Sequence, residues 1–409
     1  MKRISAISTL ALAAGFLLSI SLHAEMAQEP LEAGQSSLEG GMDAAQGADL
    51  SADAAAEAAM PTPTATPTPR PDCGGLKIVA GDGTPGYNGD DGLGVAARLN
   101  GPVGLCFDAR GDLYIADRGN NVVRELDRSG TLKTVAGDGT AGFQGDGGPA
   151  IYAELDQPGG VCVDDQGDLY ISDTLNDRIR KVDTSGNIST VVGDGMRGYN
   201  GNQGPALAAT LDAPQGLCFD SSGALYFAEA ANHVVRKVGL NGVVTTLAGN
   251  GSQGDSGDGN TAVSAQLDTP MGVCVDGQGN VYIADAGSNS VRKVDPYGDI
   301  STVAGDGQAG YQGDQGGAAV ARLRRPLAVA LGPQGNLYIA DSGNHVVRMV
   351  YLNGAITTVA GNGTAGTDDQ ESQATEAELG VPEGLAVDSA GDLYISDQAN
   401  SRVTELNCP

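Results

Sequence analysis

The sequence is poor in aromatic and basic side chains. Its 409 residues include no tryptophan, aromatic residues make up 4%, and 23 Lys and Arg face 51 Asp and Glu, for a formal net charge of -28. A nucleic-acid binder needs clustered Lys and Arg to neutralise phosphates, so this composition excludes that class of protein. The same shortage argues against docking on an anionic membrane surface.

Glycine and small apolar residues are abundant. The chain has 63 glycines, and 40% of its residues are hydrophobic, which is enough to build a packed core. The glycines follow no Gly-X-Y period, so a collagen-like fibre is not indicated. Glycine at this level favours many turns, and many turns favour short strands.

The only long apolar run lies at the N-terminus. Lys2 and Arg3 precede a stretch that reaches Leu22 and the small residue Ala24. This pattern predicts a cleavable secretory signal over residues 1–24, with a retained membrane anchor as the alternative. We therefore expect an exported protein, whether periplasmic, on the cell surface or secreted, with no membrane span after signal cleavage.

The next segment has the composition of a tether. Residues 25–60 contain eight acidic and no basic side chains among Ala, Gly, Ser and Gln, which predicts disorder. The sequence "PTPTATPTPRP" then predicts a semi-rigid polyproline II linker over residues 61–72, with an O-glycosylated stalk as the alternative. The remaining residues, 73–409, form the predicted folded domain.

Two motifs recur in this domain with a constant spacing of 56 residues. A Gly-Asp/Asn-Gly triplet begins at Gly81, Gly137, Gly193, Gly249, Gly305 and Gly361. A Leu/Val-Tyr-Ile/Phe motif places its tyrosine at Tyr114, Tyr170, Tyr226, Tyr282, Tyr338 and Tyr394. Fixed spacing over six copies is the signature of a repeat architecture.

Each copy contains four short β-prone runs. In the first copy these are "VGLCFD", "DLYIAD", "VVRELD" and "TLKTVAG", each bounded by turn residues. Four antiparallel strands in each of six units predict an all-β fold, a six-bladed β-propeller.

The two ends of the domain predict how the propeller closes. The run at 76–81 matches a fourth strand, whereas the last copy stops after its third, so both termini are expected to build the last blade. Cys73 and Cys408 flank this seam at adjacent repeat positions. We predict a disulfide between them that contributes at most on the order of 5 kcal/mol.

The other cysteines share one position in the first strand of successive blades. They are Cys106, Cys162, Cys218 and Cys274, and Ala330 and Ala386 replace them in the last two copies. Interchange with alanine predicts small, buried and inert thiols, and the spacing does not favour a metal site.

The repeat resembles a known family. The sequences "GDLYIADRGNNVVRELDRSG" and "GNLYIADSGNHVVRMVYLNG" are similar to NHL-repeat propellers, whose Asn-His-Leu type tripeptide corresponds to Asn232-His233-Val234 and Asn344-His345-Val346. The long insertion "AGDGTAGFQGDGGPAIYAELDQP" is similar to the inter-blade loops of teneurin-type NHL propellers. The resemblance implies the propeller fold; for function it implies an interaction platform, a sensor domain or, occasionally, an enzyme.

Enzymatic branches of such propellers resemble metal-dependent lyases or lactonases with catalytic or zinc-binding histidines. Only His233 and His345 follow the signal, two repeats apart, and no third partner recurs with them. We expect both to be structural or merely exposed. The acid that ends each second strand, such as Asp117, and the Arg seven residues later recur in nearly every blade, which indicates a structural role.

Calcium is the one cofactor candidate, and no other cofactor is expected. The inter-blade insertions repeat acids or amides on glycine-rich loops, and the weak candidate ligands are Asp138, Asp146, Asp306 and Asp314. Oxygen ligands of this kind suit a hard cation. Ordinary Asx-Gly turn chemistry is the alternative.

A ligand site should break the six-fold pattern. The residue after the proline that begins each first strand varies most, and its candidate ligand-binding members are Val103, Gln215, Met271, Leu327 and Glu383. Arg322, Arg324 and Arg325 form a dense basic cluster before the fifth such strand, which predicts a docking site for an acidic or polar partner. Local pairing of these arginines with neighbouring carboxylates is the alternative.

The sequence thus predicts a monomeric, non-enzymatic scaffold that binds an extracytoplasmic protein or carbohydrate on its loop-rich face. The alternative is a calcium-dependent hydrolase or lyase that uses carboxylates around the central channel. A purely structural role in an envelope or matrix also stays open.

Overall fold

The computed structural model describes residues 73–368 and 373–407. The predicted signal, acidic segment and linker, as well as Cys408, lie outside these residues. Within the described ranges, no helix is long and apolar enough to cross a membrane.

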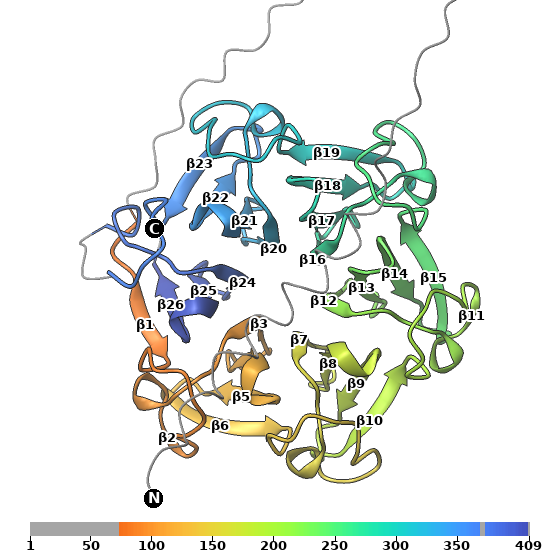
Figure 1. Ribbon diagram of the computed structural model, residues 1–409, viewed down its shortest axis with the longest axis vertical. Coiled ribbons are helices and arrows are strands. Elements are labelled where there is room, and N and C mark those ends of the chain that lie inside the picture. The colour runs from red at the N-terminus through yellow and green to blue at the C-terminus, as the bar shows by residue number, and fades with distance from the viewer. Residues whose placement is uncertain (1–72, 369–372, 408–409) are drawn as a thin grey trace, which may run out of the picture. The chain divides into compact units, whose positions relative to one another are not determined.

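Six antiparallel sheets stand in a ring around a central channel (Figure 1). Each sheet is one blade, with its first strand at the channel and its fourth strand at the outer edge. The predicted six-bladed propeller is therefore confirmed, with the 56-residue period as one blade.

The strands of the first three blades are given in order from the channel outward. Blade one contains β3 (Pro102–Phe107), β4 (Leu113–Asp117), β5 (Val122–Leu126) and β6 (Thr131–Ala136). Blade two contains β7 (Pro158–Val163), β8 (Leu169–Asp173), β9 (Arg178–Val182) and β10 (Ile188–Val192). Blade three contains β12 (Pro214–Phe219), β13 (Leu225–Glu229), β14 (Val234–Val238) and β15 (Val243–Ala248).

The other three blades follow the same order. Blade four contains β16 (Pro270–Val275), β17 (Val281–Asp285), β18 (Ser290–Val294) and β19 (Ile300–Ala304). Blade five contains β20 (Pro326–Leu331), β21 (Leu337–Asp341), β22 (Val346–Val350) and β23 (Ile356–Ala360). Blade six contains β24 (Pro382–Val387), β25 (Leu393–Asp397), β26 (Arg402–Leu406) and β1 (Lys77–Ala80).

Short elements decorate the loops between these strands. The inter-blade insertions carry two-residue strands that pair with β6 and β15, namely β2 (Gly92–Leu93) and β11 (Gly204–Pro205). They also carry 3-10 turns at η1 (Gly94–Ala96), η3 (Ala150–Tyr152), η5 (Ala206–Ala208), η6 (Ala262–Ser264) and η7 (Ala318–Val320). Between second and third strands lie η2 (Arg118–Asn120), η4 (Thr174–Asn176), η8 (Ser342–Asn344) and η9 (Gln398–Asn400).

The ring closes as the sequence predicts. In blade six, β1 pairs antiparallel with β26, so the N-terminal strand completes a sheet whose other three strands end the domain. The ring is thus closed within blade six, by the pairing of strands from the two ends of the folded domain.

Glycines allow the first strands of neighbouring blades to approach closely. A Cβ on Gly104 would lie 2.7 Å from the carbonyl oxygen of Gly159 in the next blade, and one on Gly160 would lie 2.5 Å from that of Gln215. A side chain at such distances would overlap the neighbouring backbone, and blade five alone carries one at this position, Ala328. The repeated glycine of the first strand therefore makes the central channel narrow.

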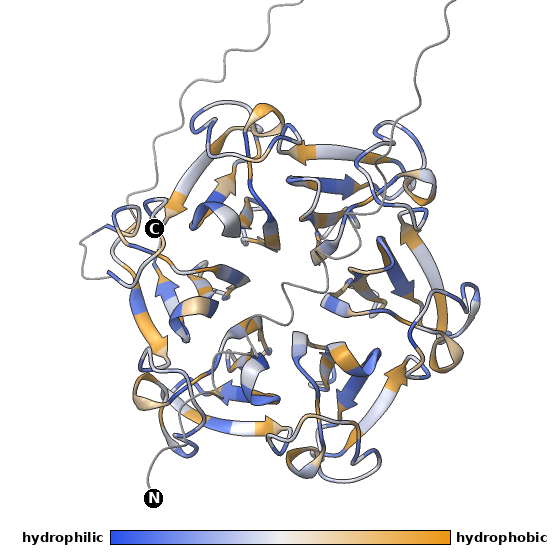
Figure 2. Cartoon of the chain, viewed as in Figure 1, coloured by the Kyte–Doolittle hydropathy of each residue, from blue (hydrophilic) through white to orange (hydrophobic). Residues whose placement is uncertain are grey.

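Charged residues lie inside the blades as well as on them. Figure 2 shows the third strands, such as β9 and β18, in the hydrophilic colour. Nevertheless, the arginine in the third strand of blades one to five is fully buried, and these residues are Arg124, Arg180, Arg236, Arg292 and Arg348. Buried charge of this kind requires partners within the protein.

Candidate functional site

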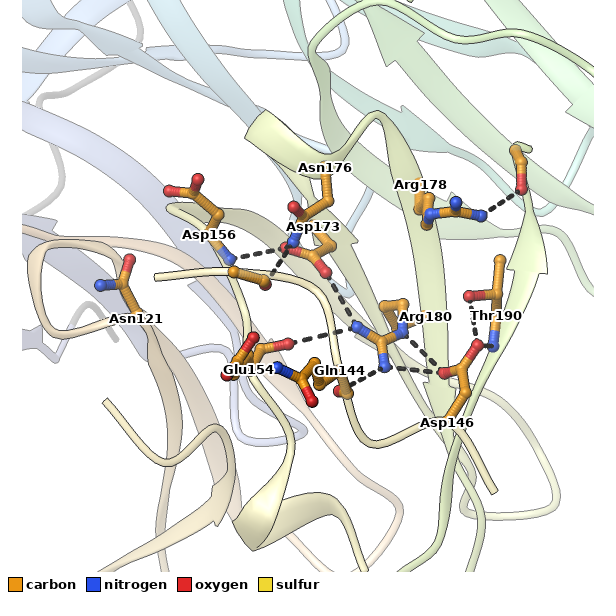
Figure 3. A network of polar contacts seen from close by, with 12 residues as sticks. Asn121, Gln144, Asp146, Glu154, Asp156, Asp173, Asn176, Arg178, Arg180 and Thr190 are labelled. Atoms are coloured by element: carbon orange, nitrogen blue, oxygen red, sulfur yellow. Dashed lines mark hydrogen bonds and ion pairs between the residues drawn. The ribbon is translucent and has the colours of Figure 1, made fainter. Parts of the chain in front are cut away.

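The partners of the buried arginines are clearest in blade two (Figure 3). Arg180 pairs with Asp173 at 3.0 Å and with Asp146 of the preceding insertion at 2.7 Å. The other oxygen of Asp173 accepts a hydrogen bond at 2.8 Å from the backbone N–H of Asp156, just before the first strand. This network ties the second strand, the third strand and the insertion together, as the predicted structural role requires.

Burial governs the charge state of the acid in this network. Burial raises the pKa of Asp173 to about 6, against opposing hydrogen bonds from Asp156 and Asn176 and the charge of Arg180. The same burial raises the pKa of Asp117 and Asp341 to about 6, and that of Glu229 and Asp285 to about 7. Because the raised pKa recurs in five blades, it follows from the repeated blade structure and does not single out one functional acid.

The calcium candidates already have hydrogen-bond donors. Asp146 and Asp314 accept from the buried arginines, the latter from Arg348 at 2.6 Å. Asp138 and Asp306 each accept a hydrogen bond from the backbone N–H two residues on, the geometry of an Asx turn. No group of three or more metal-ligating side chains gathers within the described ranges. Calcium binding stays a prediction.

Both histidines lie at contacts between blades. Nδ1 of His233 accepts a hydrogen bond at 3.2 Å from the backbone N–H of Thr269 in the next blade. Asn121 and Asn289 accept the equivalent bond in blades one and four, from Gln157 and Arg325. His345 contacts the carbonyl oxygen of Gly380 through Nδ1. The repeat position thus links adjacent blades, and a general base is not needed to explain either histidine.

The varied position after each first-strand proline lies at the mouth of the central channel. We call these residues the channel rim: Val103, Gly159, Gln215, Met271, Leu327 and Glu383. They surround a cavity of about 90 Å³. Its wall includes apolar residues two positions further along each first strand: Leu105, Val161, Leu217, Val273, Val329 and Leu385. The structure therefore brings the five predicted rim residues together.

A residue that sequence reasoning missed reaches this cavity. Arg118 follows the acid of the second strand, and its guanidinium contacts Glu383 at 2.8 Å and Gln215 at 3.3 Å. Its side chain is 22% exposed and that of Glu383 is 11% exposed. One arginine thus joins blades one, three and six at the channel rim.

The surroundings of Arg118 depart from the six-fold pattern. At the equivalent position, the hydroxyl of Thr174 donates to the carbonyl oxygen of Pro214 in the next blade at 2.8 Å, and Ser342 makes the same bond to Pro382. A Cβ on Gly159 would lie 2.8 Å from Oε1 of Gln215, so glycine leaves space for the Gln215 side chain. Of the six residues at this repeat position, only Arg118 is charged, and this difference is the signal that the sequence offers.

The predicted basic cluster divides into two parts. Arg322 contacts Asp306 at 3.4 Å and Gln308 at 2.9 Å, as Arg98 contacts Asp82 in the first insertion. Local pairing therefore accounts for Arg322.

Arg324 and Arg325 behave differently. Both are exposed, and their backbone N–H groups donate to Asp341 and Asn289 at 2.7 and 3.0 Å. Within residues 73–368 and 373–407, neither guanidinium has a hydrogen bond or an ion pair. Their charge faces solvent beside Leu327 of the channel rim.

Acids occupy the position of Arg324 in the three preceding blades. Burial raises the pKa of Asp156 and of Asp212, and Asp212 also pairs with Arg197 at 3.2 Å. Asp268 is the third member. The turns before the first strands are therefore acidic in blades two to four and basic in blade five. The sign of the charge on the loop-rich face thus differs between these blades.

Only one of the two cysteines of the predicted disulfide lies within the described residues. Cys73 is buried, 8% exposed, and packs in the core cluster that contains residues of blades five and six. Cys408 lies outside the described residues, so the pairing stays a prediction.

Comparison with known proteins places the repeat in a family. A model of the teneurin NHL domain matches residues 138–200 and 250–310, and a model of the NHL repeat matches residues 99–125, 323–348 and 379–406. Protein SUPPRESSOR OF QUENCHING 1 of Arabidopsis thaliana is 29% identical over 67% of this chain and 27% of its own length. Teneurin-3 of Mus musculus is 28% identical over 76% of this chain, which spans only 12% of that relative.

Solved structures share the fold. An auxiliary nutrient binding protein of Bacteroides thetaiotaomicron has a TM-score of 0.60 and 18% identity, covering 81% of this chain and 76% of its own. A gluconolactonase of Xanthomonas campestris has a TM-score of 0.54 and 17% identity, covering 82% and 90%. At such low identity these likenesses concern the fold alone. The matched repeats and the six blades that they build lead to one conclusion: this chain belongs to the NHL-repeat family of β-propellers.

Proposed function

We propose that this protein is an exported, non-enzymatic scaffold that binds a protein or carbohydrate partner on its loop-rich face. The observation that carries the proposal is the break in symmetry at the channel rim. Five of the six blades repeat the buried arginine and its acid, whereas the rim has a different residue in every blade. One partner cannot use six identical environments at once, so the varied ring is where a partner would find a unique surface.

The chemistry of this face supports a polar or acidic partner. Arg324 and Arg325 are exposed cations beside the rim on a domain in which 42 acidic and 20 basic side chains leave a net charge of -22 over residues 73–409. Exposed charge of the minority sign steers a complementary partner and sets its orientation. Arg118, Gln215 and Glu383 add hydrogen-bonding groups at the centre, next to the apolar Met271 and Leu327.

Export is part of the same proposal. It rests on the predicted signal at residues 1–24 and on the tether-like composition of residues 25–72. The auxiliary nutrient binding protein that shares the fold is consistent with a ligand-binding role, although the likeness reaches only the fold.

The hydrolase or lyase alternative calls for convergent carboxylates around the channel. The rim presents one carboxylate, Glu383, and Arg118 already pairs with it. Elemental analysis of the purified protein and calorimetric titration with calcium separate the two functions. Bound calcium, or heat and a thermal shift on titration, would favour the metal-dependent enzyme over the scaffold.

The proposal is tested by capture with the full chain. Immobilised protein is exposed to an envelope extract of the native organism and, separately, to arrays of acidic and neutral oligosaccharides. The variant carries Arg324→Ala and Arg325→Ala together, and the matched control is Arg128→Ala, an exposed arginine in the turn between β5 and β6. The proposal predicts that the control retains every ligand of the wild type and that the double variant loses at least one. Equal retention by both variants contradicts the arginine docking site.

A further inference from the structure

A groove of about 500 Å³ lies between blades two and three, away from the channel rim. Its wall includes the turn between β7 and β8 in blade two, and the turns between β12 and β13 and between β14 and β15 in blade three. In an antiparallel blade these turns lie at the end opposite to the loops that precede the first strands. The groove and the cavity at the channel rim share no lining residue, so they are separate sites.

The wall of this groove is largely apolar and partly uncovered. Tyr170 and Phe219 pack edge to face, with their ring centroids 4.8 Å apart and an angle of 76° between the rings. Two further lining residues, Leu207 of the insertion and Leu240 of the turn between β14 and β15, are 59% and 78% exposed. Covering exposed leucines beside a hollow walled by aromatic rings is favourable, because it removes apolar surface from water.

The charge of the groove has one sign. Its charged lining residues are Asp164, Asp165 and Asp220, and none of its lining residues is Lys or Arg. Two lysines next to the groove are already paired, Lys181 with Asp168 and Lys237 with Asp220. The other two acids of the lining form no ion pair within the described part of the chain, and Asp165 is exposed. An occupant that carries positive charge beside an apolar side chain is therefore favoured.

The equivalent groove between blades six and one differs in these properties. It has the same edge-to-face pair, Phe107 and Tyr394, with centroids also 4.8 Å apart. Its volume is about 300 Å³, and its lining includes Lys77 and Arg128, the second at the repeat position of Leu240. The groove between blades one and two, of about 740 Å³, is also lined by two basic residues, Arg110 and Lys133. Among these three grooves, the one between blades two and three combines the aromatic pair with acids and no basic residue.

We propose that this groove is a docking site for a peptide segment of a partner protein that carries an aliphatic or aromatic side chain next to Lys or Arg. The apolar side chain packs against the aromatic pair and covers the two leucines, and the adjacent cation faces Asp165. Two other occupants carry the wrong charge. Residues 25–60 of this chain have eight acidic and no basic side chains, and a second copy of residues 73–409 has 42 acidic against 20 basic side chains.

The test uses the full chain and a library of random octapeptides. Beads that display the library are panned on the immobilised protein, and calorimetry then measures the affinity of each selected peptide. We expect selected peptides that place Lys or Arg next to Leu, Ile, Phe or Trp. A variant that carries Leu207→Ser and Leu240→Ser together should bind these peptides at least about tenfold more weakly. Selection of no such peptide would overturn the proposal.

The matched control tests whether the effect belongs to this groove. It carries Val95→Ser and Leu352→Ser, which change exposed side chains at the same two repeat positions in blades one and five. The control should bind the selected peptides as the wild type does, and so should Arg324→Ala with Arg325→Ala, because the proposal is independent of the channel rim. Equal affinity of the peptides for the groove variant and the wild type would contradict the proposal.

A single charge substitution tests the need for a cation. Asp165→Asn should weaken binding of the selected peptides roughly threefold at low salt, as loss of an exposed ion pair does, and the difference should shrink in high salt. Asp91→Asn, at an exposed acid in the first insertion, is the control and should leave the affinity unchanged. Equal low-salt affinity of Asp165→Asn and the wild type would contradict the assignment of a basic occupant.

Discussion

The interior of the blades and the channel rim follow opposite rules. Inside the blades, one arginine and one acid repeat in five copies, are fully buried, and are tied to the preceding insertion or turn. At the rim, six different residues stand at one repeat position and surround one small cavity. Residues that every blade needs in order to fold are repeated, whereas residues that act at a single location vary from blade to blade.

The difference also separates two kinds of arginine. Arg180 is inaccessible and pairs with two carboxylates. Arg324 is exposed, and its guanidinium contacts no partner among the described residues. A charge that is satisfied within the fold stabilises it, whereas a charge left to solvent is available to a partner. Substitutions should therefore affect stability in one region and binding in the other.

The largest expected effect is the loss of an acid from the blade network. Asp173→Ala removes one of the two carboxylates that pair with Arg180 and the acceptor for the Asp156 N–H, so the free energy of unfolding should fall by about 3–5 kcal/mol. Chemical denaturation measures this change. Asp165→Ala, an exposed acid in the neighbouring turn, is the control and should change stability by less than about 0.5 kcal/mol. A similar, small effect of both substitutions would remove the distinction between the two regions.

The same network predicts an unusual dependence of stability on pH. Burial raises the pKa of Asp173 from 3.8 to about 6, so between these values the folded state holds more protons than the unfolded state. The stability contributed by protonation is therefore full below pH 4 and is lost as the pH rises through about 6. For one such carboxyl the loss is roughly 3 kcal/mol.

Calorimetry from pH 4 to 7 measures this dependence. The unfolding temperature should fall as the pH rises, and Asp173→Asn, which cannot titrate, should flatten the slope. A wild-type unfolding temperature that rises over this range would show that the buried acids are ionised already at pH 4.

A smaller effect is expected where the first strands meet. A Cβ on Gly384 would collide with the carbonyl oxygen of Val103, so Gly384→Ala should destabilise the ring by about 1–3 kcal/mol. Gly277→Ala is the control, because a Cβ there meets nothing within 4 Å. Equal unfolding free energies of the two variants would show that the channel is not held narrow by close strand contact. Ala328 in blade five shows that the ring tolerates one such methyl group.

Repetition made most of the fold predictable from the sequence. The 56-residue period gives the blade, and a leading fourth strand with a final three-stranded copy gives the closure that β1 and β26 show. The rim was also predictable, because its residues share one repeat position and a ring places them together. The blade, the closure and the rim all follow from the position of each residue within the 56-residue repeat, which can be read from the sequence.

Contacts that depend on side-chain direction were not predictable in this way. Arg118 lies outside the varied rim position, and only the structure shows that it reaches blades three and six. Proximity in sequence places Arg322 in one cluster with Arg324, yet Arg322 pairs with Asp306 of its own insertion. Exchange with alanine predicts that all four thiols are buried, yet only Cys162 is buried, and Cys106, Cys218 and Cys274 are partly exposed.

The separation of binding from stability is tested most directly by measuring both in one triple variant, Arg118→Ala, Arg324→Ala and Arg325→Ala. Removing Arg118 leaves the mostly buried Glu383 without its partner, so the free energy of unfolding should fall by about 1–3 kcal/mol, less than on Asp173→Ala. Affinity for a ligand captured by the wild type should fall roughly tenfold or more. Unchanged affinity, or a loss of stability as large as that of Asp173→Ala, would contradict the assignment of the rim to binding and of the blade network to folding.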